Sequence, residues 1–316
     1  MHDSVKKLKI QLIGAALTVV VSAVALSATT YAWFVTNSRV HATTSTISAQ
    51  ANGMVLQIVE GDTPDHGSDT STIASATGHE ISPSSTNDAK NWYVPQGWQG
   101  VNVSTYQKVD ISISGEAPGK YTIQGNDYYA FTAANYTLYT VANTGVADVY
   151  LDASNGSPIT ITRHGGTQKW FDKIIGSLRV GIVINGVLRV VYAPAAPSTT
   201  DTGNDVVTVA GWSCVDSESL NKVVAPTYLH LSSTDSLDQN GDNWGATKAG
   251  EAYIKPSGNA QKVASSVDYN GTNMKIVIWM EGTDSDCQNW SEQGKNTAAP
   301  TFDVTVSLVG IVPDGK

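Results

Sequence analysis

The chain has 316 residues, a formal net charge of −9 and no cluster of Lys or Arg beyond its first ten positions. This composition excludes binding to nucleic acid or to an anionic membrane through a basic patch. With 41% hydrophobic residues, including many Val, Ile, Tyr and Trp, the chain is also too apolar to be disordered. Abundant Thr and Val with few charged residues favour strands, so we expect an all-β protein.

The first 32 residues have the layout of a secretory signal. Three lysines between positions 6 and 9 precede an almost uncharged apolar segment over 10–28, and small residues follow it. We expect a signal helix here, cleaved by a signal peptidase between Ala32 and Trp33 (or, as a second option, after Ala28), and a protein secreted to the cell surface. The alternative is a retained anchor, because the apolar run is close to the ~20 residues that span a bilayer.

The first half of the mature chain alternates strand signals with polar sequence. Residues 55–60 are a short apolar strand, and residues 61–90 form a polar stretch that we expect to be an exposed loop or an insertion. Residues 109–114 alternate between apolar and polar side chains, as a half-buried strand does. Strands are also expected over 128–140 and 146–151.

The clearest local prediction is a β-hairpin over 177–192, where two β-branched runs flank Asn185-Gly186. This dipeptide is favoured in the type I′ turn of tight hairpins. Only residues 165–176 suggest a helix. Further strand signals lie at 206–210, 252–254, 275–280 and 302–311.

Together these elements predict an antiparallel β-sandwich or jelly roll, preceded by the hydrophobic signal helix. We expect residues 1–32 to be the signal peptide. Residues 33–316 are expected to be one domain, with insertions near 61–100 and 232–272. The sequence shows no repeat with a period of 20–50 residues, which excludes solenoids and propellers.

Catalytic motifs are missing from the sequence. His79-Glu80 begins like a zinc-protease motif, but no histidine stands four positions after His79. The chain also contains neither a G-x-S-x-G nucleophile elbow nor a phosphate-binding or dinucleotide-binding loop. We therefore predict that the protein is not an enzyme. A hydrolase with a triad assembled only by the fold is the remaining catalytic alternative.

Two acidic clusters are candidates for calcium, the one cofactor that the sequence suggests. Asp238, Asn240 and Asp242 offer closely spaced oxygen ligands around Gly241, although the bidentate Glu of a calcium loop does not follow. The alternative is a solvated turn in which Asp and Asn side chains cap their own backbone. The same two interpretations apply to a second cluster, which holds Glu281, Asp284 and Asp286.

The two cysteines, Cys214 and Cys287, are a candidate disulfide in an exported protein. The alternative is two separate buried thiols that behave as small apolar side chains. Three aromatic residues close in sequence, Trp92, Tyr93 and Trp98, are a candidate platform for a carbohydrate. Here the alternative is that the rings cover the edge of the sandwich.

Three segments resemble exported proteins of the TasA/camelysin type from Firmicutes. Residues 28–49 (ATTYAWFVTNSRVHATTSTISA) resemble the signal-peptide junction of that family, in which an Ala followed by an aromatic pair opens the mature chain. Residues 276–289 (IVIWMEGTDSDCQN) resemble a turn of clostridial surface proteins with the same N-terminus, and residues 178–194 (LRVGIVINGVLRVVYAP) are similar to a hairpin of that group.

The resemblance implies a jelly-roll subunit of an extracellular fibre or biofilm matrix, processed by a SipW-like signal peptidase. In such fibres the N-terminal strand of one subunit completes the sheet of the next, so the main partner is another copy of the chain, with other matrix or surface components as further partners. The segment for donation is 35–50, with loose alternation at Val40, Ala42, Thr44 and Thr46. Two alternatives stay open: this segment is the first strand of the chain's own sandwich, or the protein is a surface adhesin or carbohydrate-binding module.

Overall fold

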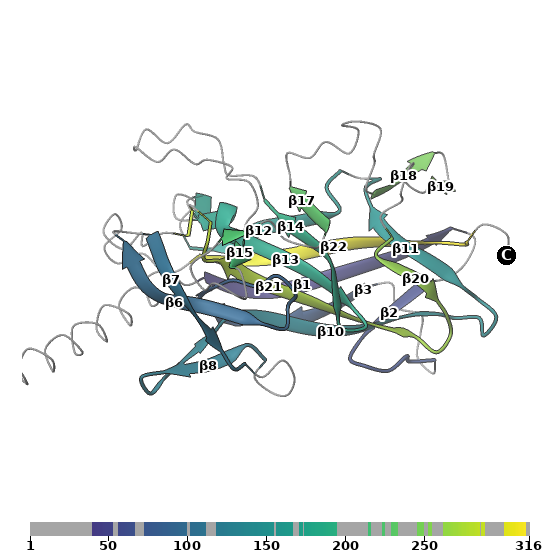
Figure 1. Ribbon diagram of the computed structural model, residues 1–316. Helices are drawn as coiled ribbons and strands as arrows, with labels where there is room; N and C mark the ends of the chain where they lie inside the picture. Colours follow the sequence, from purple (N-terminus) through teal and green to yellow (C-terminus); the bar gives the residue numbers. More distant parts are fainter. Residues whose placement is uncertain are drawn as a thin grey trace, which may run out of the picture.

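The computed structural model describes residues 40–52, 56–66, 73–99, 102–111, 118–154, 156–166, 171–172, 174–194, 214–215, 223–224, 229–232, 245–249, 252–254, 262–284, 286–287 and 300–313. Two large and three two-stranded sheets account for most of this part of the chain, which confirms the expected all-β class (Figure 1). Its helical turns lie close to η1 (Ile175–Ser177), and none of the described helical structure is long and apolar enough to cross a membrane. The predicted cleavage pair Ala32-Trp33 and the candidate calcium ligands Asp238, Asn240 and Asp242 lie outside the described residues.

Sheet A joins strands from both ends of the chain. Its nine strands are β1 (Val40–Asn52), β3 (Ile73–Thr77), β4 (Glu80–Ile81), β11 (Ala147–Asp152), β12 (Ile159–Gly165), β18 (Gly245–Ala249), β19 (Ala252–Ile254), β20 (Ala264–Val267) and β22 (Thr301–Ile311). The order along the sheet is β19-β18-β11-β22-β1-β3. β12 also pairs with β22, β20 with β11, and β4 with β1. The first and the last described strands are therefore neighbours.

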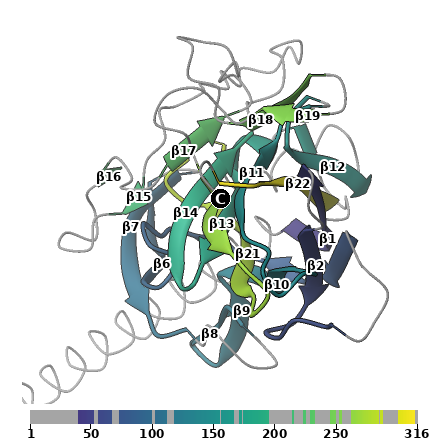
Figure 2. The same ribbon diagram turned by 90° about the vertical axis from the view of Figure 1, so that its right-hand side faces the viewer.

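Sheet B faces sheet A and is centred on a strand near the end of the chain. Its seven strands are β2 (Leu56–Glu60), β5 (Pro83–Ser84), β10 (Phe131–Thr140), β13 (Leu178–Ile184), β14 (Val187–Ala193), β17 (Leu229–Ser232) and β21 (Thr272–Glu281). The order is β17-β14-β13-β21-β10-β2, and β5 pairs with the end of β21. Figure 2 looks along the sandwich, with β13, β21 and β10 in the middle and β22, β1 and β12 to their right.

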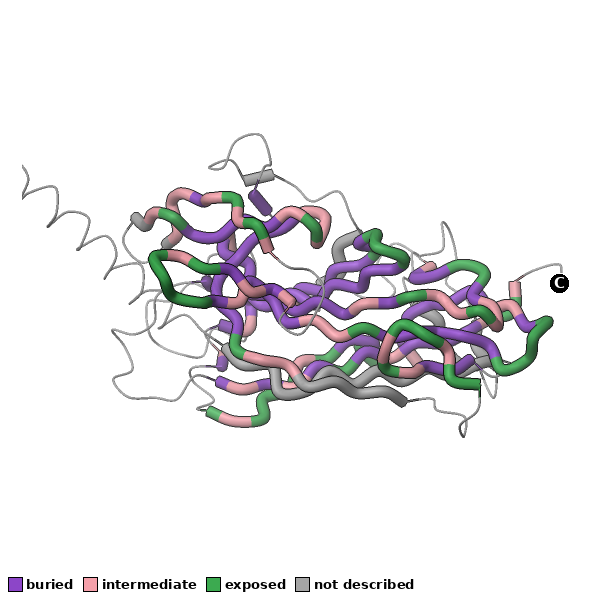
Figure 3. The backbone as a smooth tube through the Cα atoms, turned by 90° about the horizontal axis from the view of Figure 1, so that it is seen from below, coloured by how far each residue is buried: buried purple, intermediate pink, exposed green. Residues whose placement is uncertain are grey.

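The main core lies between the two sheets and is made by alternate residues of each strand. In β22, Phe302, Val304, Val306 and Leu308 are fully buried, whereas Thr305 between them is exposed. The same alternation brings Met274, Ile276, Ile278 and Met280 of β21 into this core. Burial of each such side chain contributes about 1.5–3 kcal/mol. Figure 3 shows buried positions along the strands and exposed ones mainly at the turns.

A third layer covers part of the outer face of sheet B. It consists of two hairpins, β6 (Trp92–Gln99) with β7 (Asn102–Val109) and β8 (Lys120–Ile123) with β9 (Asn126–Tyr129). Trp92 and Tyr128 from this layer share a second buried cluster with Phe131, Val277 and Trp279 of sheet B. The remaining small sheet is β15 (Cys214–Val215) with β16 (Val223–Val224).

The hairpin prediction is confirmed in detail. β13 and β14 are joined by Asn185 and Gly186, whose φ angles of 48° and 76° are both positive, as a type I′ turn requires. Asn tolerates the left-handed region and glycine has no Cβ to clash there, which explains why this dipeptide starts the turn.

Three expectations need correction. The polar stretch 61–90 is not simply an exposed loop, because Ser82 and Ser84 through Thr86 are buried and β3, β4 and β5 lie within it. Of the strand expected over 109–114, Val109 is the last residue of β7, residues 110–111 are not in a strand, and residues 112–114 lie outside the described part. The sheets are mixed rather than purely antiparallel: β1–β22, β11–β18, β14–β17 and β5–β21 pair in parallel.

Candidate functional site

The strand proposed for assembly, β1, is paired on both sides in sheet A. On one side it runs parallel to β22, from His41 opposite Thr301 to Asn52 opposite Ile311. On the other side it pairs antiparallel with β3 and then with β4. Backbone hydrogen bonds of a ladder depend little on side-chain identity, so any chain that presents this strand in register can make them.

The residues expected to carry assembly all fall in this strand. Val40, Ala42, Thr44 and Thr46 lie in β1, where Val40 is opposite Ile81 of β4 and Thr46 is opposite Thr305 of β22. The described arrangement thus places the segment in the sandwich of its own chain. Only residues 53–55 connect the end of β1 in sheet A to the start of β2 in sheet B.

Next to β21, the turn that follows the IVIWME run forms a buried polar centre. Glu281, fully buried, accepts hydrogen bonds from the Trp279 indole N–H at 3.1 Å and from the Thr283 backbone N–H and hydroxyl at 3.1 and 2.9 Å. Arg179 of β13 forms an ion pair of 2.5 Å with Asp284 and also donates to the carbonyl oxygen of Leu178. These bonds hold the turn against the start of β13, the strand beside β21 in sheet B.

The electrostatics of this centre are dominated by burial. Loss of water raises the pKa of the Glu281 carboxyl, while Arg179 and the hydrogen bonds from Ser85 and Trp279 oppose that rise. Burial, reinforced by Asp284, raises the pKa of the Cys287 thiol well above its usual value. A thiol that stays protonated is a poor nucleophile, so Cys287 fits a packing role.

The acidic residues of the turn serve the fold. The Asp284 carboxylate pairs with Arg179 and accepts the backbone N–H of Asp286 at 2.9 Å. Asp286 packs against Gly176, where a Cβ would lie 1.8 Å from its carboxylate. In the described part of the chain, no three His, Cys, Asp or Glu side chains are grouped as a metal site. The hydrogen bonds of Glu281 and Asp284 to groups of the same turn are those that the capped-turn interpretation expects.

The proposed sugar platform is not available at its first two positions. Trp92 is 1% exposed and stacks on Phe131, with ring centroids 4.4 Å apart, and meets Trp279 edge-on at 5.8 Å. Tyr93 is also buried and packs with Tyr106. Trp92 covers the outer face of sheet B, whereas the alternative interpretation had placed the rings at the edge of the sandwich. The side chain of Trp98 is outside the described part.

The two cysteines are buried and not joined by a disulfide. Cys287 belongs to the core between the sheets. Cys214 stands beside Val215, which packs with Tyr93 and Tyr106 in a separate cluster. The structure therefore holds two separate thiols, the alternative to the predicted disulfide.

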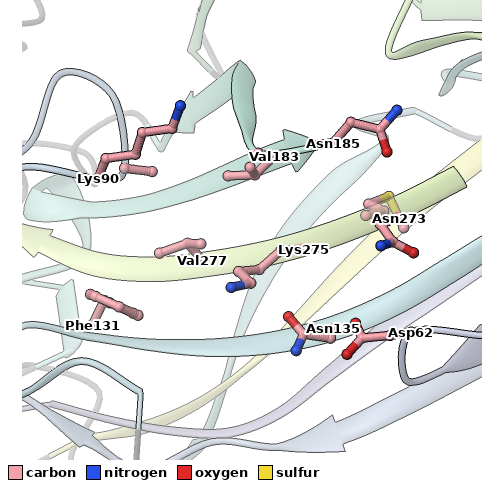
Figure 4. A pocket seen from close by; sticks show the side chains of 12 residues that line it. Asp62, Lys90, Phe131, Asn135, Val183, Asn185, Asn273, Lys275 and Val277 are labelled. Carbon is pink, nitrogen blue, oxygen red and sulfur yellow. The ribbon is translucent and has the colours of Figure 1, made fainter. Parts of the chain in front are cut away.

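A groove on the outer face of sheet B was missed by the sequence analysis. It begins where the third layer ends, has a volume of about 420 Å³, and crosses β10, β21 and β13 (Figure 4). Its residues include Asp62, Lys90, Phe131, Asn135, Val183, Asn185, Asn273, Lys275 and Val277. The sequence does contain a signal for this groove. Along the outward face of β21, the residues change from apolar Val277 to polar Lys275 and Asn273.

The chain was compared with family models, with characterised proteins and with solved structures, and none of them matches it.

Proposed function

We propose that the chain is an exported, non-enzymatic structural subunit that polymerises into an extracellular fibre or biofilm-matrix filament by exchange of β1. The TasA/camelysin-type N-terminus supports this proposal at the level of sequence. The observation that carries it is the position of β1 between β22 and β3 in sheet A. On this proposal the sandwich is jelly-roll-like, and cleavage before Trp33 frees the segment that leads into β1.

Exchange of β1 has a low free-energy cost. A β1 donated by a neighbour can make the same ladder with β22 and β3 that it makes at home, so the hydrogen bonds lost in one place are regained in the other. Without β1, the edge of β22 exposes its N–H and C=O groups, which are a template for a strand from another chain. The three-residue connection to β2 also favours exchange, because short hinge loops promote domain swapping.

The direction of exchange predicts an open polymer. If each chain gives β1 to the next and receives β1 from the previous one, contacts are head-to-tail. Head-to-tail contacts that do not close into a ring generate a helical filament. The partners of the chain are then copies of itself, in addition to the signal peptidase that releases it.

Two single-cysteine variants test where β1 pairs. Ser48 of β1 is opposite Ser307 of β22. Neighbouring strands lie ~4.8 Å apart, within the Cα separation that a disulfide allows. Ser48→Cys and Ser307→Cys are made in separate mature chains, which are unfolded, mixed, refolded together and oxidised mildly. Donation between chains gives a disulfide-linked dimer in which mass spectrometry identifies the 48–307 linkage.

The parent protein is the matched control, because its two native thiols are buried and should give no dimer. Circular dichroism verifies that each variant folds. A doubly substituted chain that forms the 48–307 link within itself, with no dimer in the mixed sample, would show that β1 stays in its own sandwich.

A further inference from the structure

The groove on sheet B has a closely packed apolar floor. Val277 of β21 and Val183 of β13 point outward from the sheet, together with Phe131 of β10 (Figure 4). These side chains belong to the cluster that the third layer covers and are almost fully buried, with exposed fractions of 2% for Phe131 and Val277 and 8% for Val183. The floor is therefore fixed by packing, and a ligand in the groove would contact mainly the polar side chains around it.

The rim of the groove is made by side-chain amides. Asn135, Asn185 and Asn273 come from β10, the hairpin turn and β21, and they lie at the same end of the groove as Asp62 (Figure 4). Each amide presents two N–H donors and one carbonyl acceptor. Neighbouring hydroxyl groups of a saccharide both donate and accept, so they match amides better than they match a purely cationic or purely anionic rim.

The charged side chains of the groove have a net positive charge, although the whole chain is negatively charged. Lys90 and Lys275 line it with one carboxylate, Asp62, while the whole chain carries −9. Lys275 stands in the middle, opposite Asn135 on one neighbouring strand and Val183 on the other. Burial lowers the pKa of the Lys275 ammonium, and Asp62 opposes this effect.

Asp62 is held at the edge of this arrangement. The N–H of the preceding residue, Gly61, donates to the carbonyl of Asn135 at 2.8 Å, and the Thr137 hydroxyl donates to the carbonyl of Gly61 at 2.8 Å. Asp62 therefore lies beside Asn135 and at a distance along the groove from Lys90 (Figure 4). Lys90 is at the other end, whereas Lys275 lies between the two and is close enough to Asp62 for this carboxylate to affect its pKa (Figure 4).

We propose that this groove binds an acidic saccharide chain, with hydroxyl groups on the three asparagines and a carboxylate on Lys275. The groove is large enough for a short saccharide segment, since ligand sites commonly occupy ~300–1,000 Å³. It lies on sheet B, whereas β1 is in sheet A. Saccharide binding and strand exchange can therefore fail or succeed independently.

Calorimetry with the mature protein and a galacturonic acid trimer tests the proposal. Saturable binding is expected, weakened at least tenfold by Lys275→Met, which removes the charge and keeps a similar length, and by Asn273→Ala. Lys120→Met is the matched control, because Lys120 pairs with Asp127 on the exposed β8–β9 hairpin and should leave binding unchanged. Added salt should weaken binding of the trimer.

A neutral sugar and an acidic peptide show whether the groove prefers acidic saccharides to other classes of ligand. A neutral maltotriose should bind at least tenfold more weakly than the galacturonic acid trimer. Equal binding of the two sugars, preference for a poly-glutamate peptide over the sugar, or binding that Lys275→Met leaves unchanged would each overturn the proposal. No binding of the trimer at millimolar concentration by a protein that circular dichroism shows to be folded would overturn it as well.

Discussion

Arg179 and Asp284 form a buried ion pair of 2.5 Å across 105 residues of sequence. The pair joins β13 to the turn after β21, beside the fully buried Glu281. Because the Arg179 guanidinium also donates to main-chain carbonyl oxygens, it connects the turn to the start of β13. The segment resembling a clostridial surface-protein turn is thus the point at which two strands of sheet B are fixed together.

Arg179→Met is expected to destabilise the fold by about 3–5 kcal/mol, because removing one partner of a buried pair leaves carboxylates without a counter-charge. Urea unfolding measures the effect. The loss should be larger at pH 8 than at pH 5, since burial raises the pKa of Glu281 and its protonation at lower pH removes one of the charges that Arg179 offsets. Arg189→Met, at an exposed position of β14, is the control and should change stability by less than ~0.5 kcal/mol. Equal effects of the two substitutions would contradict a structural role of the pair.

The contribution of Glu281 to the free energy of unfolding should decrease as the pH rises. Burial raises its pKa above the ordinary value of 4.5, so the folded state holds the proton more tightly than the unfolded state. The contribution of this group is therefore greatest below pH 4.5 and is lost as pH rises through the folded-state pKa. We expect Glu281→Gln to cost more stability at pH 5 than at pH 8, as measured by urea unfolding.

A surface substitution, Glu60→Gln, provides the reference for removal of one carboxylate. If the cost of Glu281→Gln instead grew with pH, Glu281 would be stabilised as an anion by Arg179, and burial would not be the dominant effect.

The Trp92 side chain is expected to stabilise the fold rather than to bind a ligand. Its ring is packed between Phe131 and Trp279, so Trp92→Ala should cost about 3–5 kcal/mol of stability. Trp92→Phe should restore part of that loss, because an aromatic ring still fills the site. Thermal unfolding followed by calorimetry provides the measurement. A Trp92→Ala protein with unchanged melting temperature would mean that the ring is not part of the packed layer.

The sequence predicted the parts of the fold that depend on local patterns. The Asn185-Gly186 turn and the apolar alternation of β21 and β22 are local features, and the structure has them. The parallel pairing of β1 with β22 could not be read in this way, because it joins segments about as far apart as the chain allows. Alternation shows which face of a strand is buried but not which strand lies beside it.

The same reason explains what was wrong or missed around the candidate sites. The carbohydrate platform was suggested only by the closeness of Trp92, Tyr93 and Trp98 in sequence, yet in the structure Trp92 is buried within a third layer of hairpins. The groove depends on where that layer stops over sheet B, which no local pattern records. Asn135 and Lys275 become neighbours only through the register of β10 with β21.

Cleavage of the leader is expected to leave Trp33 as the first residue, because Thr30-Tyr31-Ala32 follows a basic and apolar segment as a small-residue cleavage site does. Intact-mass analysis of the protein recovered from the cell surface gives the N-terminus directly. Ala32→Pro should block processing at this bond. A surface form that still begins at Met1 would indicate a retained anchor.

Deletion of β1 should destabilise the fold, and a peptide with the sequence of β1 should restore the lost stability. A chain that lacks residues 33–52 keeps every strand of sheet B but loses the strand between β22 and β3, so sheet A is divided. The buried side chains of β22, such as Val304 and Val306, then lose part of their cover. We expect this chain to aggregate or unfold at a lower temperature.

A synthetic peptide with the sequence of residues 40–52 should raise the melting temperature of the shortened chain in proportion to the logarithm of its concentration, as a ligand specific for the folded state does. A peptide with the same composition in scrambled order is the control. Rescue by the native peptide alone would show that β22 accepts β1 from outside its own chain, the physical requirement for strand exchange. If the shortened chain is as stable as the full mature chain, or if both peptides act alike, β1 is not the strand that completes sheet A.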